Sequence, residues 1–232
     1  MRKLFGTDGI RGRANHYSMN VETTLSLARA FGQWLKSTSP GRKRVVIGKD
    51  TRLSCYIYEN ALIAGLCSMG IDTLMVGPLP TPGVAFITRA YRADAGIMIS
   101  ASHNPYHDNG IKFFSADGYK FPDSLEKTIE ELIFKKDFET ALPIDREIGK
   151  NSKVDDADGR YIEFVKATLP RRFSFAGLRV ILKTAKLLKP KSGTVALCNA
   201  NEQIQEVLEI SGFLGMINLH NSLNDAISAI NN

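Results

Sequence analysis

Apolar and polar positions along the first hundred residues alternate between a helical and an extended period. Short β-branched runs at 44–48, 73–76 and 95–99 predict buried strands. A helical period fills the two gaps between these runs and also precedes the first of them. The order strand, helix, strand, helix, strand predicts an α/β fold, namely a mainly parallel sheet with helices on both faces.

The three expected helices carry end signals of their own. The first begins behind Asn20, a favoured N-cap residue. The second, over about 56–69, is followed by Gly70 at the position where helices often end in a left-handed residue. Thr81 and Pro82 predict the N-cap and first residue of the third helix.

Beyond the third strand, polar and glycine-rich positions predict turns and a linker. Asn109-Gly110 and Ala116-Asp117-Gly118 are turn signals on either side of the apolar run 111–114, a pattern that predicts a hairpin at the edge of the sheet. A helix is expected over about 124–136, and the polar stretch 149–159 is expected to be a linker.

The chain after residue 177 shows a second, smaller α/β pattern. Its expected elements are a helix over 178–189, a strand over 194–198, a helix over 202–210 closed by Gly212, a strand near 216–219 and a helix over 223–230 capped by Ser222.

Composition places the chain among ordinary globular proteins, with 44% hydrophobic and 23% charged residues in 232. We expect no membrane span, because no run of about 18 apolar residues occurs, and no signal peptide, because Met1-Arg2-Lys3 leads into no apolar segment. Cys55, Cys67 and Cys198 show no metal-ligand spacing. They are expected to be free, buried thiols in the reducing cytoplasm.

The net charge of +6 is uneven, because residues 166–191 hold eight Lys or Arg and no acidic residue. A basic stretch can attract nucleic acid. No aromatic ladder or recognition motif accompanies this one, so a solvated basic face is expected and no nucleic-acid partner.

The loop after the third strand carries the candidate chemistry. Ser102 lies in Ser100-Ala101-Ser102-His103-Asn104-Pro105, just past a buried strand, where a phosphorylated serine would find hydrogen-bond donors. A hydrolase would need a base and usually a G-x-S-x-G elbow, which is absent, as is a Walker A loop. From these residues alone, a plain turn-forming loop remains an open alternative.

Four motifs, at 6–12, 48–52, 100–105 and 109–112, resemble in order and spacing those of the α-D-phosphohexomutase family. The resemblance runs to about residue 177 and is closest to members acting on glucosamine phosphates. It implies interconversion of glucosamine 6-phosphate and glucosamine 1-phosphate through a phosphoserine and a bisphosphorylated sugar. The implied partners are a hexosamine phosphate and a hexose 1,6-bisphosphate.

The resemblance also implies roles for single residues. The catalytic positions it implies are Ser102 as phosphoserine, Lys112, Arg11 and His103. The positions it implies for substrate or phosphate binding are Asn104, Thr7, Asp8, Lys49 and Arg52. The implied cofactor is Mg²⁺, with Ser102 as a ligand through its phosphate. Phosphoryl transfer rests mainly on positioning and electrostatics.

The resemblance is partial. The Asp-rich metal loop, the sugar-reading loop and the phosphate clamp of the family's later domains do not occur in these 232 residues. Turnover by this chain alone is therefore not expected. Residues from about 177 to 232 resemble the back half of a STAS domain, which divides the chain into 1–177 and 178–232. A half-domain would leave an edge of its sheet unpaired, so this segment is expected to pack against the first domain or to dimerise. The alternative function is a non-catalytic module that binds sugar phosphate or, through 178–232, a protein partner or a second copy.

Overall fold

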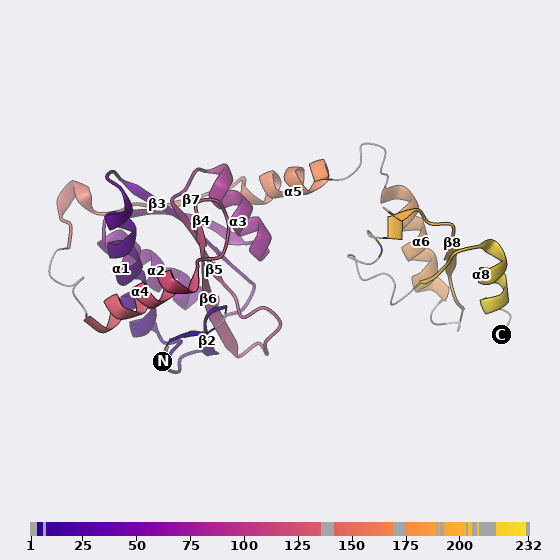
Figure 1. Cartoon of the computed structure of the whole chain (residues 1–232), viewed down its shortest axis with the longest axis horizontal. Helices are drawn as coiled ribbons and strands as arrows, with labels where there is room; N and C mark the ends of the chain where they lie inside the picture. The colour runs from indigo at the N-terminus through magenta and orange to yellow at the C-terminus, as the bar shows by residue number, and fades with distance from the viewer. Residues whose placement is uncertain are drawn as a thin grey trace. The chain divides into compact units, whose positions relative to one another are not determined.

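The strand that leads to the serine loop lies in the middle of a seven-stranded sheet (Figure 1). The computed structural model describes residues 4–6, 8–135, 142–168, 175–188, 190, 193–202, 204–205, 208 and 217–230. The chain divides into two units, Met1–Thr168 and Leu169–Asn232. Helix α6, Phe175–Leu188, spans the boundary near residue 177 that the two resemblances suggest, and that boundary stays a prediction.

The sheet of the first unit has the order β1-β2-β6-β5-β3-β4-β7. Its strands are β1 (Phe5–Gly6), β2 (Gly9–Arg13), β3 (Lys43–Lys49), β4 (Ile71–Pro78), β5 (Ala95–Ile99), β6 (Asp108–Ser115) and β7 (Asn151–Lys153). Strands β5, β3, β4 and β7 are parallel to one another, whereas β6, β2 and β1 join them in antiparallel pairs. The expected α/β fold is confirmed.

Helices cover both faces of this sheet (Figure 1). They are α1 (Val21–Thr38), α2 (Cys55–Ser68), α3 (Thr81–Ala90), α4 (Asp123–Lys135) and α5 (Ala157–Thr168), with a 3₁₀ turn at Asp145–Glu147. Helices α1, α2 and α4 pack on one face, where Phe31, Phe113 and Phe121 are buried. Helix α3 packs on the other face, in a cluster with Met98 and Phe114, and the start of α5 packs against α3. Side chains of successive strand residues point to opposite faces, so β3, β4, β5 and β6 contribute to both cores.

Local sequence explains how the first layer begins. The Asn20 side chain accepts a hydrogen bond from the Thr23 N–H at 2.8 Å, which confirms the predicted N-cap of α1. Gly65 of α2 faces Ala28 of α1 so closely that a Cβ on Gly65 would lie 2.4 Å from the Ala28 Cβ. The glycine therefore sets how closely these two helices pack.

Three predictions about the later part of the first unit were wrong. Asn109-Gly110 is no turn, because both residues lie inside β6, an interior strand rather than an edge. Residues 149–159 are no linker, because β7 pairs with β4 and α5 starts within that stretch. Thr81 is the first residue of α3 rather than its cap, and Pro80 takes the N-cap position.

The second unit contains α6, β8 (Ala196–Cys198), β9 (Asn218–His220) and α8 (Leu223–Ile230). Strands β8 and β9 are parallel. Ser222 caps α8 as predicted, because its Oγ accepts a hydrogen bond from the Asp225 N–H at 3.1 Å. Residues 202, 204, 205 and 208 of the expected helix over 202–210 are helical, and the rest of it and Gly212 lie outside the described residues.

No helix in the part of the chain that the structure describes combines the length and the apolar character needed to cross a membrane.

Candidate functional site

The serine loop connects two neighbouring antiparallel strands. It leaves β5 at Ile99 and enters β6 at Asp108, so both of its ends are held by the sheet. Ser102 is exposed and has a φ of +57°, in the left-handed region that L-residues other than Asn and Asp rarely adopt. Its Oγ lies 3.5 Å from His103 Nδ1. The loop therefore presents the hydroxyl at the carboxyl end of a buried strand, where ligands bind in open α/β sheets.

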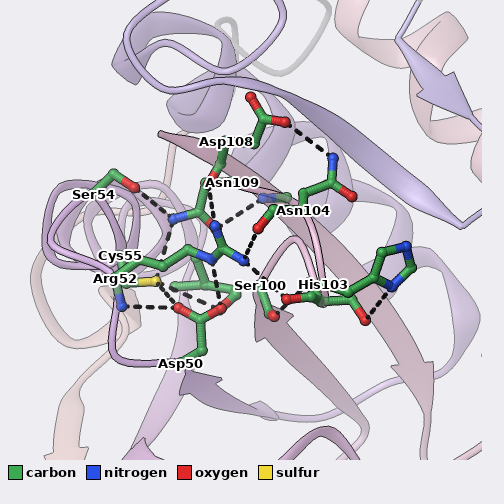
Figure 2. Close-up of polar contacts among 12 residues, drawn as sticks. Asp50, Arg52, Ser54, Cys55, Ser100, His103, Asn104, Asp108 and Asn109 are labelled. Atoms are coloured by element: carbon green, nitrogen blue, oxygen red, sulfur yellow. Dashed lines mark hydrogen bonds and ion pairs between the residues drawn. The ribbon is translucent and has the colours of Figure 1, made fainter. Parts of the chain in front are cut away.

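Arg52 holds this loop from the segment after β3 (Figure 2). Its Nη2 donates to the carbonyl oxygens of Ser102 and Asn104, each at 2.9 Å. Its Nη1 donates to the carbonyl oxygens of Pro105 at 2.5 Å and Asp108 at 3.0 Å. Its guanidinium thus faces backbone oxygens of the loop, and its predicted role in phosphate binding stays a prediction.

The Asp50 carboxylate supports Arg52 from behind. It accepts the Arg52 Nε–H at 2.9 Å and the Arg52 backbone N–H at 3.0 Å. Burial opposes ionisation of this carboxyl, but hydrogen bonds from Cys55, Arg52 and Ser100 outweigh it and lower the pKa of Asp50. Ser100 in turn accepts the Ser102 N–H on its Oγ at 2.9 Å. Asp50 is thus connected to both sides of the Ser102 backbone.

Asn109 is buried below the loop and joins it to the start of α2 (Figure 2). Its Nδ2 donates to Ser54 Oγ at 2.8 Å and to Cys55 Sγ at 3.2 Å. Burial and the neighbouring Asp50 carboxylate raise the pKa of the Cys55 thiol to about 12. Cys55 is therefore a neutral hydrogen-bonding group and not a nucleophile.

Arg11 and Lys112 meet at Asp8. Lys112 Nζ lies 2.6 Å from Asp8 Oδ2, and Arg11 forms an ion pair with the same oxygen. Burial opposes ionisation of Asp8, but the hydrogen bond and charge of Lys112, followed by those of Arg11, lower the pKa of its carboxyl. The two cations therefore share one negative charge, and the group keeps a net charge of about +1.

Sheet register places this charged group beside the serine loop. Arg11 pairs with Gly110, and the Ser100 N–H donates to the Gly110 carbonyl oxygen at 2.9 Å. Lys112 pairs with Met98. Paired residues share a face and alternate residues do so too, so Arg11, Lys112 and Ser100 share the face covered by α3. Gly110 allows Arg11 and Ser100 to lie this close together. A Cβ at Gly110 would lie 2.9 Å from the Ser100 backbone carbonyl oxygen and 3.0 Å from Arg11 Cγ.

A pocket of about 360 Å³ opens beside Ser102. Its polar lining residues are Lys49, Asp50, Thr51, Thr81, Ser100 and Ser102. The Lys49 ammonium forms an ion pair with Glu59 and lies 3.9 Å from the centre of the Tyr56 ring. Lys49 thus reaches the pocket with its charge already compensated. Its predicted role in phosphate binding stays a prediction.

The structure describes two of the three predicted residues that remain, His103 and Asn104. His103 is exposed beside Ser102. Asn104 Nδ2 donates to Asp108 Oδ2 at 3.0 Å, so its amide shapes the loop. Thr7 lies outside the described residues. Sequence reasoning gave no site role to Asp50, Ser100, Asn109 or Glu59. A signal existed for the first three, since Asp50 and Ser100 directly follow buried strands and Asn109 opens the motif at 109–112. Glu59 lies in no motif and becomes visible only in three dimensions.

The side chains around Ser102 decide whether this chain could hold the implied Mg²⁺. Among the described residues there is no group of three His, Cys, Asp or Glu side chains placed to hold a metal ion. Asp50, the carboxylate beside Ser102, is turned toward Arg52, Cys55 and Ser100. These residues do not by themselves make a magnesium site, since Mg²⁺ requires several oxygen ligands in octahedral geometry.

Two protein families match separate parts of the chain. Residues 2–140 match the family described as phosphoglucomutase/phosphomannomutase, alpha/beta/alpha domain I. Residues 171–226 match the STAS domain. Both resemblances inferred from the motifs are confirmed.

Curated relatives are similar to the first part of the chain. A phosphoglucosamine mutase from Protochlamydia amoebophila is 68% identical over 183 residues, which are 79% of this chain and 40% of the relative. One from Chlamydia pneumoniae is 62% identical over 185 residues, 80% of this chain and 40% of the relative. The chain thus spans about two fifths of the length of these relatives.

Solved structures agree on the fold. A phosphoglucomutase/phosphomannomutase family protein from Burkholderia thailandensis has a TM-score of 0.62 at 22% identity, covering 94% of this chain and 43% of that one. A putative phosphomannomutase from Thermus thermophilus has a TM-score of 0.60 at 28% identity, covering 93% and 45%. Because the match to residues 2–140 covers more than half of the 232 residues, the chain belongs to the phosphoglucomutase/phosphomannomutase family.

Proposed function

We propose that this chain carries the phosphoserine part of a phosphoglucosamine mutase, with Ser102 as the residue that accepts and returns the phosphoryl group. The substrates would be glucosamine 6-phosphate and glucosamine 1-phosphate, with a hexosamine 1,6-bisphosphate between them. The observation that carries the proposal is the placement of Ser102, exposed on a clamped loop beside a polar pocket.

In the proposed transfer, one P–O bond forms as another breaks. The Ser102 Oγ–P bond forms as the P–O bond between phosphorus and the sugar oxygen breaks, and the hydroxyl proton of the serine ends on that sugar oxygen. Arg11 and Lys112 would stabilise the negative charge on the phosphoryl oxygens from the neighbouring strands, with His103 next to the hydroxyl. Magnesium would be bound with the phosphoserine only if further ligands joined it.

Intact mass after incubation with glucose 1,6-bisphosphate and Mg²⁺ tests this proposal. One added phosphoryl group, absent in a Ser102→Ala variant, supports it. A folded protein that stays unmodified at all bisphosphate concentrations contradicts it for this chain. The full mutase cycle is a separate measurement, in which appearance of glucosamine 1-phosphate is followed with the same two proteins.

A second candidate function concerns the second unit. The STAS match at 171–226 and an apolar row on α8 favour association with another copy of the chain. Leu223, Ile227 and Ile230 recur at helical spacing and are 59%, 48% and 56% exposed. Such a row on a helix surface often marks an interface.

Sedimentation over a range of protein concentrations tests this second function. Self-association that weakens in Ile227→Asp but persists in Ser228→Asp, a change beside the row, supports it. A monomer at every concentration contradicts it.

A further inference from the structure

We propose that Arg52 and Asp50 are positioning residues that set the left-handed backbone of Ser102 and so aim its hydroxyl for phosphoryl transfer. This inference rests on the proposed function and gives Arg52 a role other than the predicted phosphate binding.

Arg52 uses its side-chain donors within the protein. A guanidinium carries five N–H donors in a fixed plane. Here Nε faces Asp50, and the two terminal nitrogens face the carbonyl oxygens of Ser102, Asn104, Pro105 and Asp108. All five donors therefore have an oxygen partner within the protein, and 11% of the side chain is exposed. An incoming phosphate would have to displace the loop to reach this group.

The backbone N–H and the carbonyl oxygen of Ser102 are both held by hydrogen bonds. Its carbonyl oxygen is held by Arg52 Nη2 at 2.9 Å. Its N–H is held by Ser100 Oγ at 2.9 Å, and Ser100 hydrogen-bonds to Asp50. Both hydrogen-bonding groups of the residue are therefore tied, directly or through Ser100, to the Asp50–Arg52 pair.

These hydrogen bonds hold Ser102 in a left-handed backbone conformation. A non-glycine residue in the left-handed region is strained and persists only where its surroundings determine it. Two fixed peptide groups provide that determination at Ser102, whose φ is +57°. Without them the residue would relax, and its Oγ would leave the edge of the pocket.

The position of the Ser102 hydroxyl should determine the rate of the proposed phosphoryl transfer. Phosphoryl transfer depends chiefly on position and charge, and a displacement of about 1 Å can reduce a rate roughly 100-fold. Lysine cannot replace Arg52 in this role, since it offers three donors from one point and no planar fork. The role is thus separable from charge.

The test measures phosphorylation of Ser102 by glucose 1,6-bisphosphate in the full chain, by intact mass over time, for Arg52→Lys and Ser100→Ala. The matched controls are Arg13→Lys, an exposed arginine near the loop, and Ser37→Ala on α1. We expect the rate at saturating bisphosphate to fall at least 10-fold in Arg52→Lys, with the half-saturating concentration unchanged. The controls should match the wild type. Rates equal to wild type in Arg52→Lys would overturn the proposal, as would a loss confined to the half-saturating concentration.

A second measurement separates this proposal from the proposed function. The scalar coupling and the amide exchange rate of Ser102, measured by NMR, report its φ and its N–H bond in the absence of any phosphate donor. If the wild type is not phosphorylated, the proposed function fails, and these values decide the positioning role. A changed coupling in Arg52→Lys and faster exchange in Ser100→Ala support it, whereas wild-type values in both folded variants overturn it.

Discussion

Lys49 and Glu59 form an ion pair in which both side chains are almost entirely buried, 7% and 9% exposed. Lys49 ends β3, and Glu59 lies one turn inside α2, so the pair joins sheet and helix beside the pocket. Each charge is tolerated at this depth because the other compensates it.

Replacing Glu59 by Gln should therefore destabilise the fold. The Lys49 ammonium would remain buried without its carboxylate, and loss of one partner of a buried pair costs about 3–5 kcal/mol. The free energy of unfolding in urea measures this. Glu131→Gln, in an exposed pair with Lys127, is the control and should change stability by less than about 1 kcal/mol. Equal small losses in both variants would show that the Lys49–Glu59 pair is not buried.

Cys55 should resist alkylation in the folded protein. Its thiol is buried and its pKa is raised to about 12, so almost no thiolate exists at pH 8. Peptide mass mapping after iodoacetamide treatment at pH 8 should find Cys55 unmodified in the native state and modified in urea. Modification at the same rate in both states would contradict the hydrogen-bonded arrangement of Cys55 with Asp50 and Asn109.

Stability should fall in acid through Asp72, among other carboxyl groups. Arg42 donates to both oxygens of Asp72 at 2.8 Å, and these hydrogen bonds lower the pKa of the carboxyl from 3.8. A carboxyl whose pKa is lower in the folded than in the unfolded state adds stability above its unfolded pKa, and that stability is lost as the pH falls through the folded value.

The measurement compares wild type with Asp72→Asn by urea unfolding at pH 7, 5, 4 and 3. The gap between them should be constant from pH 7 to about pH 5 and should close progressively below pH 3.8, the unperturbed value. A gap that widens in acid would contradict the sign of the shift.

Two glycine substitutions should have opposite effects. Gly65→Ala places a methyl group 2.4 Å from the Ala28 Cβ and should separate α1 from α2 at a cost of about 1–3 kcal/mol. Gly159→Ala lies in α5 with no atom within 4 Å of the new Cβ, and alanine there should stabilise the helix by up to about 1 kcal/mol. Thermal unfolding of both variants checks the pair, and a stabilising Gly65→Ala would refute the close contact.

Short-range signals predicted most of the fold. The cap at Asn20 and the strand at 95–99 follow from residues next to each other in the chain, and both are confirmed. The turn predicted at Asn109-Gly110 was wrong because the same dipeptide also occurs in strands. Here Asn109 pairs with Gly12 of β2, and its side chain bonds to Ser54 and Cys55; all three partners are far away in sequence.

The site shows the same limit. Ser102 could be identified from its motif, but the direction of Arg52 could not, since four loop carbonyl oxygens converge on it only after folding. A motif shows that an arginine is present. Its partners depend on where the loop between β5 and β6 places its backbone.

The loop would also limit which molecules could deliver a phosphoryl group in the transfer proposed for Ser102. Its ends are fixed at Ile99 and Asp108 in adjacent strands, and its centre is held by Arg52. With its backbone held in this way, Ser102 would stay at the surface rather than extend into the cleft of another enzyme. We therefore expect a small, soluble phosphate ester to be a better donor than a peptide-modifying kinase.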